Sequence, residues 1–155
     1  MRTFRAKAIS GGTWVYGYPV KMPVTPVLDP ITYNSYIVSA NLADYSADLA
    51  QGFDDQDFPK TAVDDSTLSQ IVGILGKNAV TVYEGDIIIA NIYPFENYNA
   101  VIEFNADKSR FEMRFVHKPT FQGRAIFDNN TRPLEFLMNT NIDIVGDIYS
   151  NPELL

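Results

Sequence analysis

The stretch "VYEGDIIIA", residues 82–90, places a glycine between two carboxylates and follows it with three isoleucines. Gly85 adopts a positive φ at low cost, and the Asp86 side chain is suited to accept hydrogen bonds from neighbouring backbone amides. Consecutive β-branched residues are typical of a buried strand. The stretch therefore predicts an architectural turn at Glu84, Gly85 and Asp86, with a core strand after it.

The two carboxylates have a second interpretation, in which Glu84 and Asp86 bind a hard cation or act as acid and base. Adjacent strand positions point to opposite faces of a sheet, and no histidine or further acid stands nearby in the sequence. Because a tight turn explains the same residues more simply, we expect no metal site and no catalytic residue here.

Short strands are predicted on both sides of this turn through the second half of the chain. They alternate apolar and polar residues or run apolar, and they cover residues 79–83, 86–93, 99–105, 110–117 and 142–149. A short helix is predicted at 132–139, with Pro133 at its first position. Five short strands with little helix favour a small barrel or roll.

The first half is also predicted to be β-rich, although its strands are less regular. Residues 11–22 begin with a Gly-Gly turn and place Trp14, Tyr16 and Tyr18 on one strand face. Four prolines between residues 19 and 30 exclude a helix there. A short helix is predicted at 41–52, an acidic loop at 52–65, and one helical turn within 64–75.

The composition indicates a chain that folds alone, and it removes several classes of enzyme. Hydrophobic residues make up 46% and charged residues 20%, which suits a packed core. Cysteine is absent, so thiolate catalysis and cysteine zinc sites are excluded. His117 is the only histidine in the chain. We expect one mainly β domain over residues 1–155, with possible lobes at 1–75 and 76–155, and neither enzyme activity nor a cofactor.

The net charge of −7 opposes a large surface for nucleic-acid phosphates. The start of the chain lacks the apolar core of a signal peptide, and no apolar run approaches the roughly 20 residues that span a bilayer. We therefore expect a cytoplasmic protein that makes no contact with a membrane.

One stretch departs from this acidity and offers a candidate binding surface. Between residues 108 and 124 a single acid, Glu112, faces a set of basic residues: Lys108, Arg110, Arg114, Lys118 and Arg124. Phenylalanines are interleaved with them, as in surfaces that bind single-stranded nucleic acid. The simpler interpretation sends the phenylalanines into the core and the charges into water, and the overall acidity favours it.

Trp14 and Tyr16 form a second candidate recognition surface, because large amphipathic rings often anchor interfaces. A strand that packs its rings into the core is the more common use of such a pattern. Both interpretations stay open at the level of the sequence.

Four segments, in this order, resemble the YopX-like family of phage and prophage proteins. They are "FRAKAISGGTWVYGYPV", "VDDSTLSQIVGIL", "VYEGDIII" and the final "IDIVGDIYSNPELL". The resemblance implies an SH3-like barrel within residues 76–155. The family is of unknown function and has no assigned catalytic residues to carry over, so we expect an accessory protein of unknown biochemical function in a bacterial host cell. We expect a binding or assembly module that self-associates or meets a phage or host protein; the alternative is a regulator that binds single-stranded nucleic acid through residues 108–124.

Overall fold

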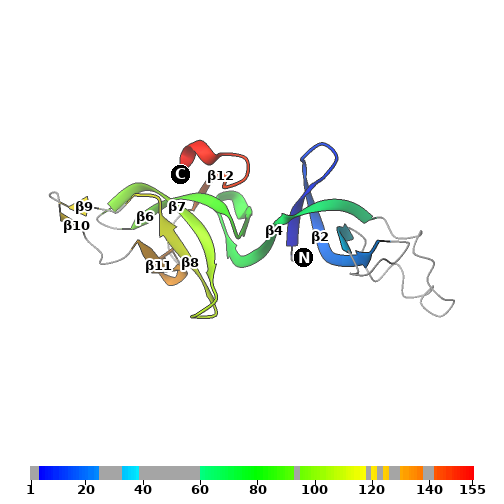
Figure 1. Cartoon of the computed structure of the whole chain (residues 1–155). Coiled ribbons are helices and arrows are strands. Elements are labelled where there is room, and N and C mark those ends of the chain that lie inside the picture. Colours follow the sequence, from blue (N-terminus) through cyan, green and yellow to red (C-terminus); the bar gives the residue numbers. More distant parts are fainter. Residues whose placement is uncertain are drawn as a thin grey trace. The chain divides into compact units, whose positions relative to one another are not determined.

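The structure is a computed structural model, shown in Figure 1. It describes residues 4–24, 33–38, 60–92, 95–117, 120–121, 124–125, 130–137 and 142–155. The fold is mainly β with antiparallel sheets and short 3-10 turns, which confirms the predicted class. The helix predicted at 41–52 and residues 52–59 of the predicted acidic loop lie outside the described residues. Residues 60–65 belong to a strand, so the loop prediction is wrong there.

Contacts divide the chain into two compact units, Met1–Gln70 and Ile71–Leu155. The division falls within one long strand, β4 (Lys60–Leu75), whose first part belongs to the first unit and whose end belongs to the second. The sequence places the border between lobes after residue 75, at the glycine that follows this strand.

The first unit is a ring of four strands: β1 (Phe4–Ala8), β2 (Trp14–Pro23), β3 (Tyr33–Val38) and the first part of β4. Each strand pairs antiparallel with the next, β1 with β2, β2 with β3 and β3 with β4, and the pairing of β4 with β1 closes the ring. Ala6, Ile37 and Val63 are buried together at its centre. Gly17 permits the close approach of two strands, because a Cβ there would collide with the carbonyl oxygen of Val38.

Residues 64–75 belong to β4, so the helical turn predicted there is wrong. The Ser66 backbone amide and hydroxyl both donate to Asp64 Oδ1, at 3.0 and 2.7 Å, and Thr67 Oγ1 donates to the Asp64 carbonyl at 2.7 Å. The Lys7 amide in turn donates to Thr67 Oγ1 at 2.8 Å, next to a register shift in the β1–β4 pairing. Side chains of the kind that start helices here stabilise an irregular strand instead.

The second unit contains a five-stranded antiparallel sheet in the order β11-β8-β7-β6-β12. Its strands are β6 (Asp86–Ile92), β7 (Phe95–Asn105), β8 (Arg110–Phe115), β11 (Thr131–Pro133) and β12 (Asp143–Asp147). The end of β4 pairs with β5 (Thr81–Tyr83). The predicted hairpin of β7 and β8 is confirmed. Among the described residues, no pairing joins the two edge strands, β11 and β12, so closure into an SH3-like barrel stays a prediction.

Short elements complete this unit. They are the 3-10 turns η2 (Lys77–Ala79), η3 (Leu134–Leu137) and η4 (Pro152–Leu154), and the small ribbon of β9 (Thr120–Phe121) and β10 (Arg124–Ala125). Pro133 ends strand β11 rather than starting a helix, and only a 3-10 turn follows it. The core of the unit gathers Val82, Ile88, Ala100, Ile102, Met113, Phe115, Leu137 and Ile142.

Candidate functional site

The Glu84–Gly85 turn joins β5 to β6, and the carboxylate after it holds the turn in place. Gly85 has φ +81°, the left-handed conformation that glycine accepts best. Asp86 is 1% exposed, and its Oδ2 accepts the Tyr83 backbone N–H at 2.8 Å. The Gly85 amide donates to the Ile102 carbonyl at 2.8 Å, so the turn is also tied to the neighbouring sheet.

A second turn with the same triplet, Gly-Asp-Ile, lies directly beside the first. Asp147 pairs with Asp86 across β12 and β6. Its Oδ1 accepts the backbone N–H groups of Tyr149 and Ser150 at 2.9 and 2.8 Å, and the Ile148 amide donates to the Gly85 carbonyl at 2.9 Å. Sequence reasoning did not single out Asp147; the recurrence of the triplet at 146–148 was the available signal.

Glu112 is the centre of a charged cluster on the β7–β8 hairpin. Its Oε1 accepts from Arg110 Nε and Nη2 at 2.9 and 2.7 Å and from Lys108 Nζ at 3.0 Å, while Oε2 accepts from Asn105 Nδ2 at 2.9 Å. The Arg110 hydrogen bond, followed by those from Lys108 and Asn105, lowers the pKa of Glu112 from 4.5 to about 2. Only 3% of the side chain is exposed, because these three side chains cover it on the face of the hairpin that it shares with Glu103 and Arg114.

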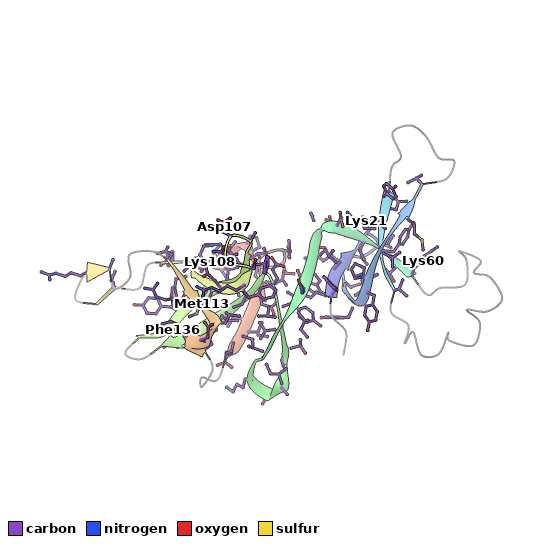
Figure 2. The ribbon with its side chains drawn as sticks, turned by 90° about the horizontal axis from the view of Figure 1, so that it is seen from below. Lys21, Lys60, Asp107, Lys108, Met113 and Phe136 are labelled. Atoms are coloured by element: carbon purple, nitrogen blue, oxygen red, sulfur yellow. The ribbon has the colours of Figure 1, made fainter. Side chains whose placement is uncertain are left out.

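Arg114 has a carboxylate partner of its own. Its Nη2 lies 2.8 Å from Glu103 Oε1, with both side chains about two-fifths exposed. Glu103 stands directly opposite Glu112 in the pairing of β7 with β8, so both carboxylates share one face of the hairpin with the cations. Lys108 lies at the turn of this hairpin beside Asp107 (Figure 2).

The structure places the described residues of the predicted nucleic-acid surface on two different elements. Lys108, Arg110 and Arg114 are ion-paired on one hairpin. Arg124 is exposed on β10, and Lys118 lies outside the described residues. A surface that follows phosphates needs cations that are available to the ligand, and most of the described ones here already meet a carboxylate.

Trp14 and Tyr16 lie on the outward face of β2, in the first unit, and both are half-buried. The guanidinium carbon of Arg5 is 4.3 Å from the centroid of the Trp14 ring, and Lys7 Nζ is 5.6 Å from it. These cation–π contacts come from the neighbouring strand β1, whose residues pair with Trp14 and Tyr16. The Trp14 ring therefore covers basic side chains of its own sheet.

An apolar groove of about 360 Å³ opens on the second unit. It is lined by Val72, Ile74, Arg110, Phe111, Leu134 and Glu135. Phe104, which is 45% exposed, packs edge to face on Phe111 with ring centroids 5.2 Å apart. The groove carries one basic and one acidic side chain, which come from β8 and η3.

Within the described ranges, no three or more histidine, aspartate or glutamate side chains are grouped so as to hold a metal ion. The same part of the chain contains no helix that is both long and apolar enough to cross a bilayer.

The chain belongs to the YopX family, because the family model described as "YopX protein" matches residues 3–155. Among solved structures it is similar to "Crystal structure of protein EF1440 from Enterococcus faecalis", with a TM-score of 0.47 and 17% sequence identity. That similarity covers 100% of this chain and 98% of the other. No curated protein matches.

Proposed function

We propose that this YopX-family chain is a phage or prophage accessory protein, a non-enzymatic module that assembles with a second copy of itself. The chemistry of its buried acids supports a non-catalytic role. Asp86 and Asp147 accept backbone amides in turns, and Glu112 accepts from three side chains. Carboxylates used in this way are poorly placed to transfer protons to or from a substrate.

The observation that carries the proposal is the apolar groove of the second unit. Its floor is aliphatic and aromatic, and Val72, Ile74, Phe111 and Leu134 are only partly buried against the core. Beside it in sequence, Phe136 is 49% exposed. Exposed apolar surface of this kind on a globular protein commonly marks a site of protein contact.

The charges of the groove favour a second copy as the occupant. Arg110 and Glu135 carry opposite charges and line the same groove. Glu112 accepts from Arg110 Nε and Nη2, and a guanidinium has five N–H donors, so Arg110 keeps donors for a second carboxylate. A two-fold axis through such a surface can set Arg110 of one copy against Glu135 of the other, and the symmetry then forms that contact twice. Charged residues at the rim of an interface fix the partner and its orientation.

The experiment is to measure the dimer dissociation constant by sedimentation velocity and native mass spectrometry. Glu135→Lys places a cation opposite Arg110 in both halves of the interface. We expect it to raise the dissociation constant at least about tenfold, since like charges at a contact are repelled. Glu135 is exposed, so the substitution leaves the core intact.

Glu153→Lys is the matched control, because it makes the same charge change at an exposed residue of η4 that does not line the groove. We expect this variant to dimerise like the wild type. A wild-type chain that stays monomeric at about 100 μM would contradict self-assembly, and equal weakening by both variants would contradict the groove as its site.

A further inference from the structure

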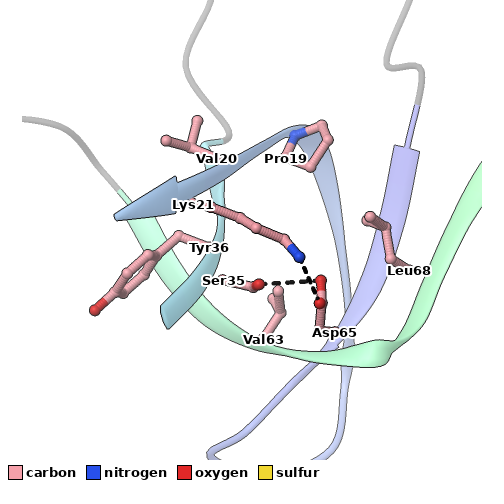
Figure 3. A pocket seen from close by; sticks show the side chains of 8 residues that line it. All are labelled: Pro19, Val20, Lys21, Ser35, Tyr36, Val63, Asp65 and Leu68. Carbon is pink, nitrogen blue, oxygen red and sulfur yellow. Dashed lines mark hydrogen bonds and ion pairs between the residues drawn. The ribbon is translucent and has the colours of Figure 1, made fainter. Parts of the chain in front are cut away.

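A pocket of about 230 Å³ opens on the first unit, where side chains of β2, β3 and β4 meet. Figure 3 shows Lys21, Ser35 and Asp65 pointing toward one another in this pocket. Ser35 precedes the buried Ile37 by two residues, and Asp65 follows the buried Val63 by two. Because side chains on a strand alternate between faces, both polar groups lie on the inward face of the strand ring.

The three polar side chains form one hydrogen-bonded group. Lys21 Nζ lies 2.8 Å from Asp65 Oδ2, and Ser35 Oγ donates to Asp65 Oδ1 at 3.0 Å. The Lys21 hydrogen bond, and then that of Ser35, holds the pKa of Asp65 below its usual value, so the carboxylate is charged at neutral pH. The Lys21 and Asp65 side chains are 61% and 50% exposed, which leaves both within reach of a solute.

Each member of this ion pair keeps hydrogen-bonding capacity. An ammonium group carries three N–H donors, and a carboxylate offers about four lone-pair sites. In the contacts recorded for the described residues, Lys21 donates to one oxygen and Asp65 accepts two hydrogen bonds. A ligand is therefore able to bind both groups without first breaking the bond between them.

The remaining walls of the pocket are mainly apolar. They are formed by Pro19, Val20, Val63 and Leu68, with Tyr36 beside them. Pockets for drug-sized ligands span roughly 300–1,000 Å³, so this one suits a smaller molecule. It combines one positive group, one negative group and an apolar wall.

We propose that this pocket binds a free α-amino acid with an aliphatic side chain. The ligand carboxylate accepts from the Lys21 ammonium, the ligand ammonium donates to the Asp65 carboxylate, and the aliphatic side chain packs on the apolar wall. Four charges of alternating sign then lie together. A ligand with a single charge would place that charge beside a like charge of the ion pair, at a cost that a zwitterion avoids.

The inference concerns the first unit and stands apart from the assembly groove, which is built from residues of the second. A free amino acid also fits better than a longer peptide, because only in the free amino acid are the ammonium and the carboxylate attached to the same carbon. The apolar wall favours leucine over glycine, because glycine has no side chain to bury there.

Isothermal titration calorimetry of the full chain tests the proposal with leucine and three analogues as probes. Leucine amide lacks the carboxylate, N-acetylleucine lacks the ammonium, and glycine lacks the side chain. We expect saturable binding of leucine, with each analogue binding at least about tenfold more weakly. Absence of leucine binding at up to about 10 mM, or equal binding of all four probes, would overturn the proposal.

Substitutions at the two charged residues of the pocket test whether leucine binds there. We expect Lys21→Gln and Asp65→Asn each to weaken leucine binding at least about tenfold, while thermal unfolding shows that both variants fold. Lys77→Gln is the matched control, because Lys77 forms an exposed ion pair with Asp143, at 3.4 Å, in the other unit. Leucine binding that survives both pocket substitutions, or that Lys77→Gln weakens as much, would place the ligand elsewhere.

Discussion

At the scale of single residues, Glu112 shows how a buried carboxylate depends on its neighbours. Lys108 and Arg110 approach it from the hairpin turn and from its own strand, and Asn105 from the strand opposite. These contacts favour the ionised form, which is why the pKa of Glu112 falls from 4.5 to about 2. The same contacts replace the water that a surface glutamate would otherwise keep.

A pH dependence of stability follows from this lowered pKa. The contribution of Glu112 to the free energy of unfolding is complete above its unfolded pKa of 4.5 and is lost as the pH falls toward about 2. We expect Glu112→Gln to destabilise the chain at neutral pH, and the difference from wild type to shrink through that window. Urea unfolding at about pH 7, 4.5 and 3 measures it.

Glu153→Gln serves as the control for this prediction, since Glu153 is an exposed acid of η4 outside the cluster. Its stability curve is expected to follow that of the wild type. A difference between wild type and Glu112→Gln that stays constant with pH would mean that the variant acts through packing rather than through charge.

At the scale of elements, the two Gly-Asp-Ile turns fasten β5, β6 and β12 to one another. Asp86 accepts the Tyr83 amide while it is itself almost fully buried. We expect Asp86→Ala to lower the free energy of unfolding by about 1–3 kcal/mol, because it leaves a buried N–H without that acceptor. Asp86→Asn keeps an acceptor oxygen and should cost less; urea unfolding of both variants measures the difference.

Glu84→Ala separates the structural role of the turn from a catalytic or metal-binding pair. Glu84 is half-buried in the same turn. We expect its removal to change stability by less than about 0.5 kcal/mol, as for ordinary surface substitutions. Equal losses for Glu84→Ala and Asp86→Ala would show that the two carboxylates act together, contrary to the single role given to Asp86.

Local patterns in the sequence predicted the elements whose partners lie close by. The turn at Gly85, the strands around it and the β7–β8 hairpin follow from alternation and turn chemistry within a short stretch. The same local patterns wrongly predicted a helical turn within residues 64–75, because the decisive hydrogen bond to Thr67 comes from Lys7, 60 residues away. No local pattern contains such a partner, and local preferences then give way to the pairing.

The candidate sites were harder to predict for the same reason. The sequence shows that Arg110 and Arg114 are basic. Only the strand register, which sets Glu103 opposite Glu112, shows that each arginine forms an ion pair with a glutamate. Lys21, Ser35 and Asp65 stand far apart in the chain and join in one pocket only because three strands carry them to the same face. The spacing of these residues along the chain therefore does not predict that their side chains lie together.

At the scale of the whole molecule, net charge and ion pairing together bear on nucleic-acid binding. The chain carries −7, and Arg110 and Arg114 each pair with a glutamate. We expect a fluorescent single-stranded oligothymidine to bind with a dissociation constant weaker than about 100 μM in low salt, measured by anisotropy. Arg114→Gln should then change little, because the cation that it removes already has a partner.

The double variant Glu103→Gln with Glu112→Gln tests whether these carboxylates are what restrains binding. It reduces the negative charge of −7 by two and releases Lys108, Arg110 and Arg114 from their partners. We expect it to bind the oligonucleotide more tightly than wild type, with an affinity that falls as salt is added. Micromolar binding by the wild type, lost on Arg114→Gln, would instead show that Arg114 leaves Glu103 for phosphate, and would favour the nucleic-acid role over assembly.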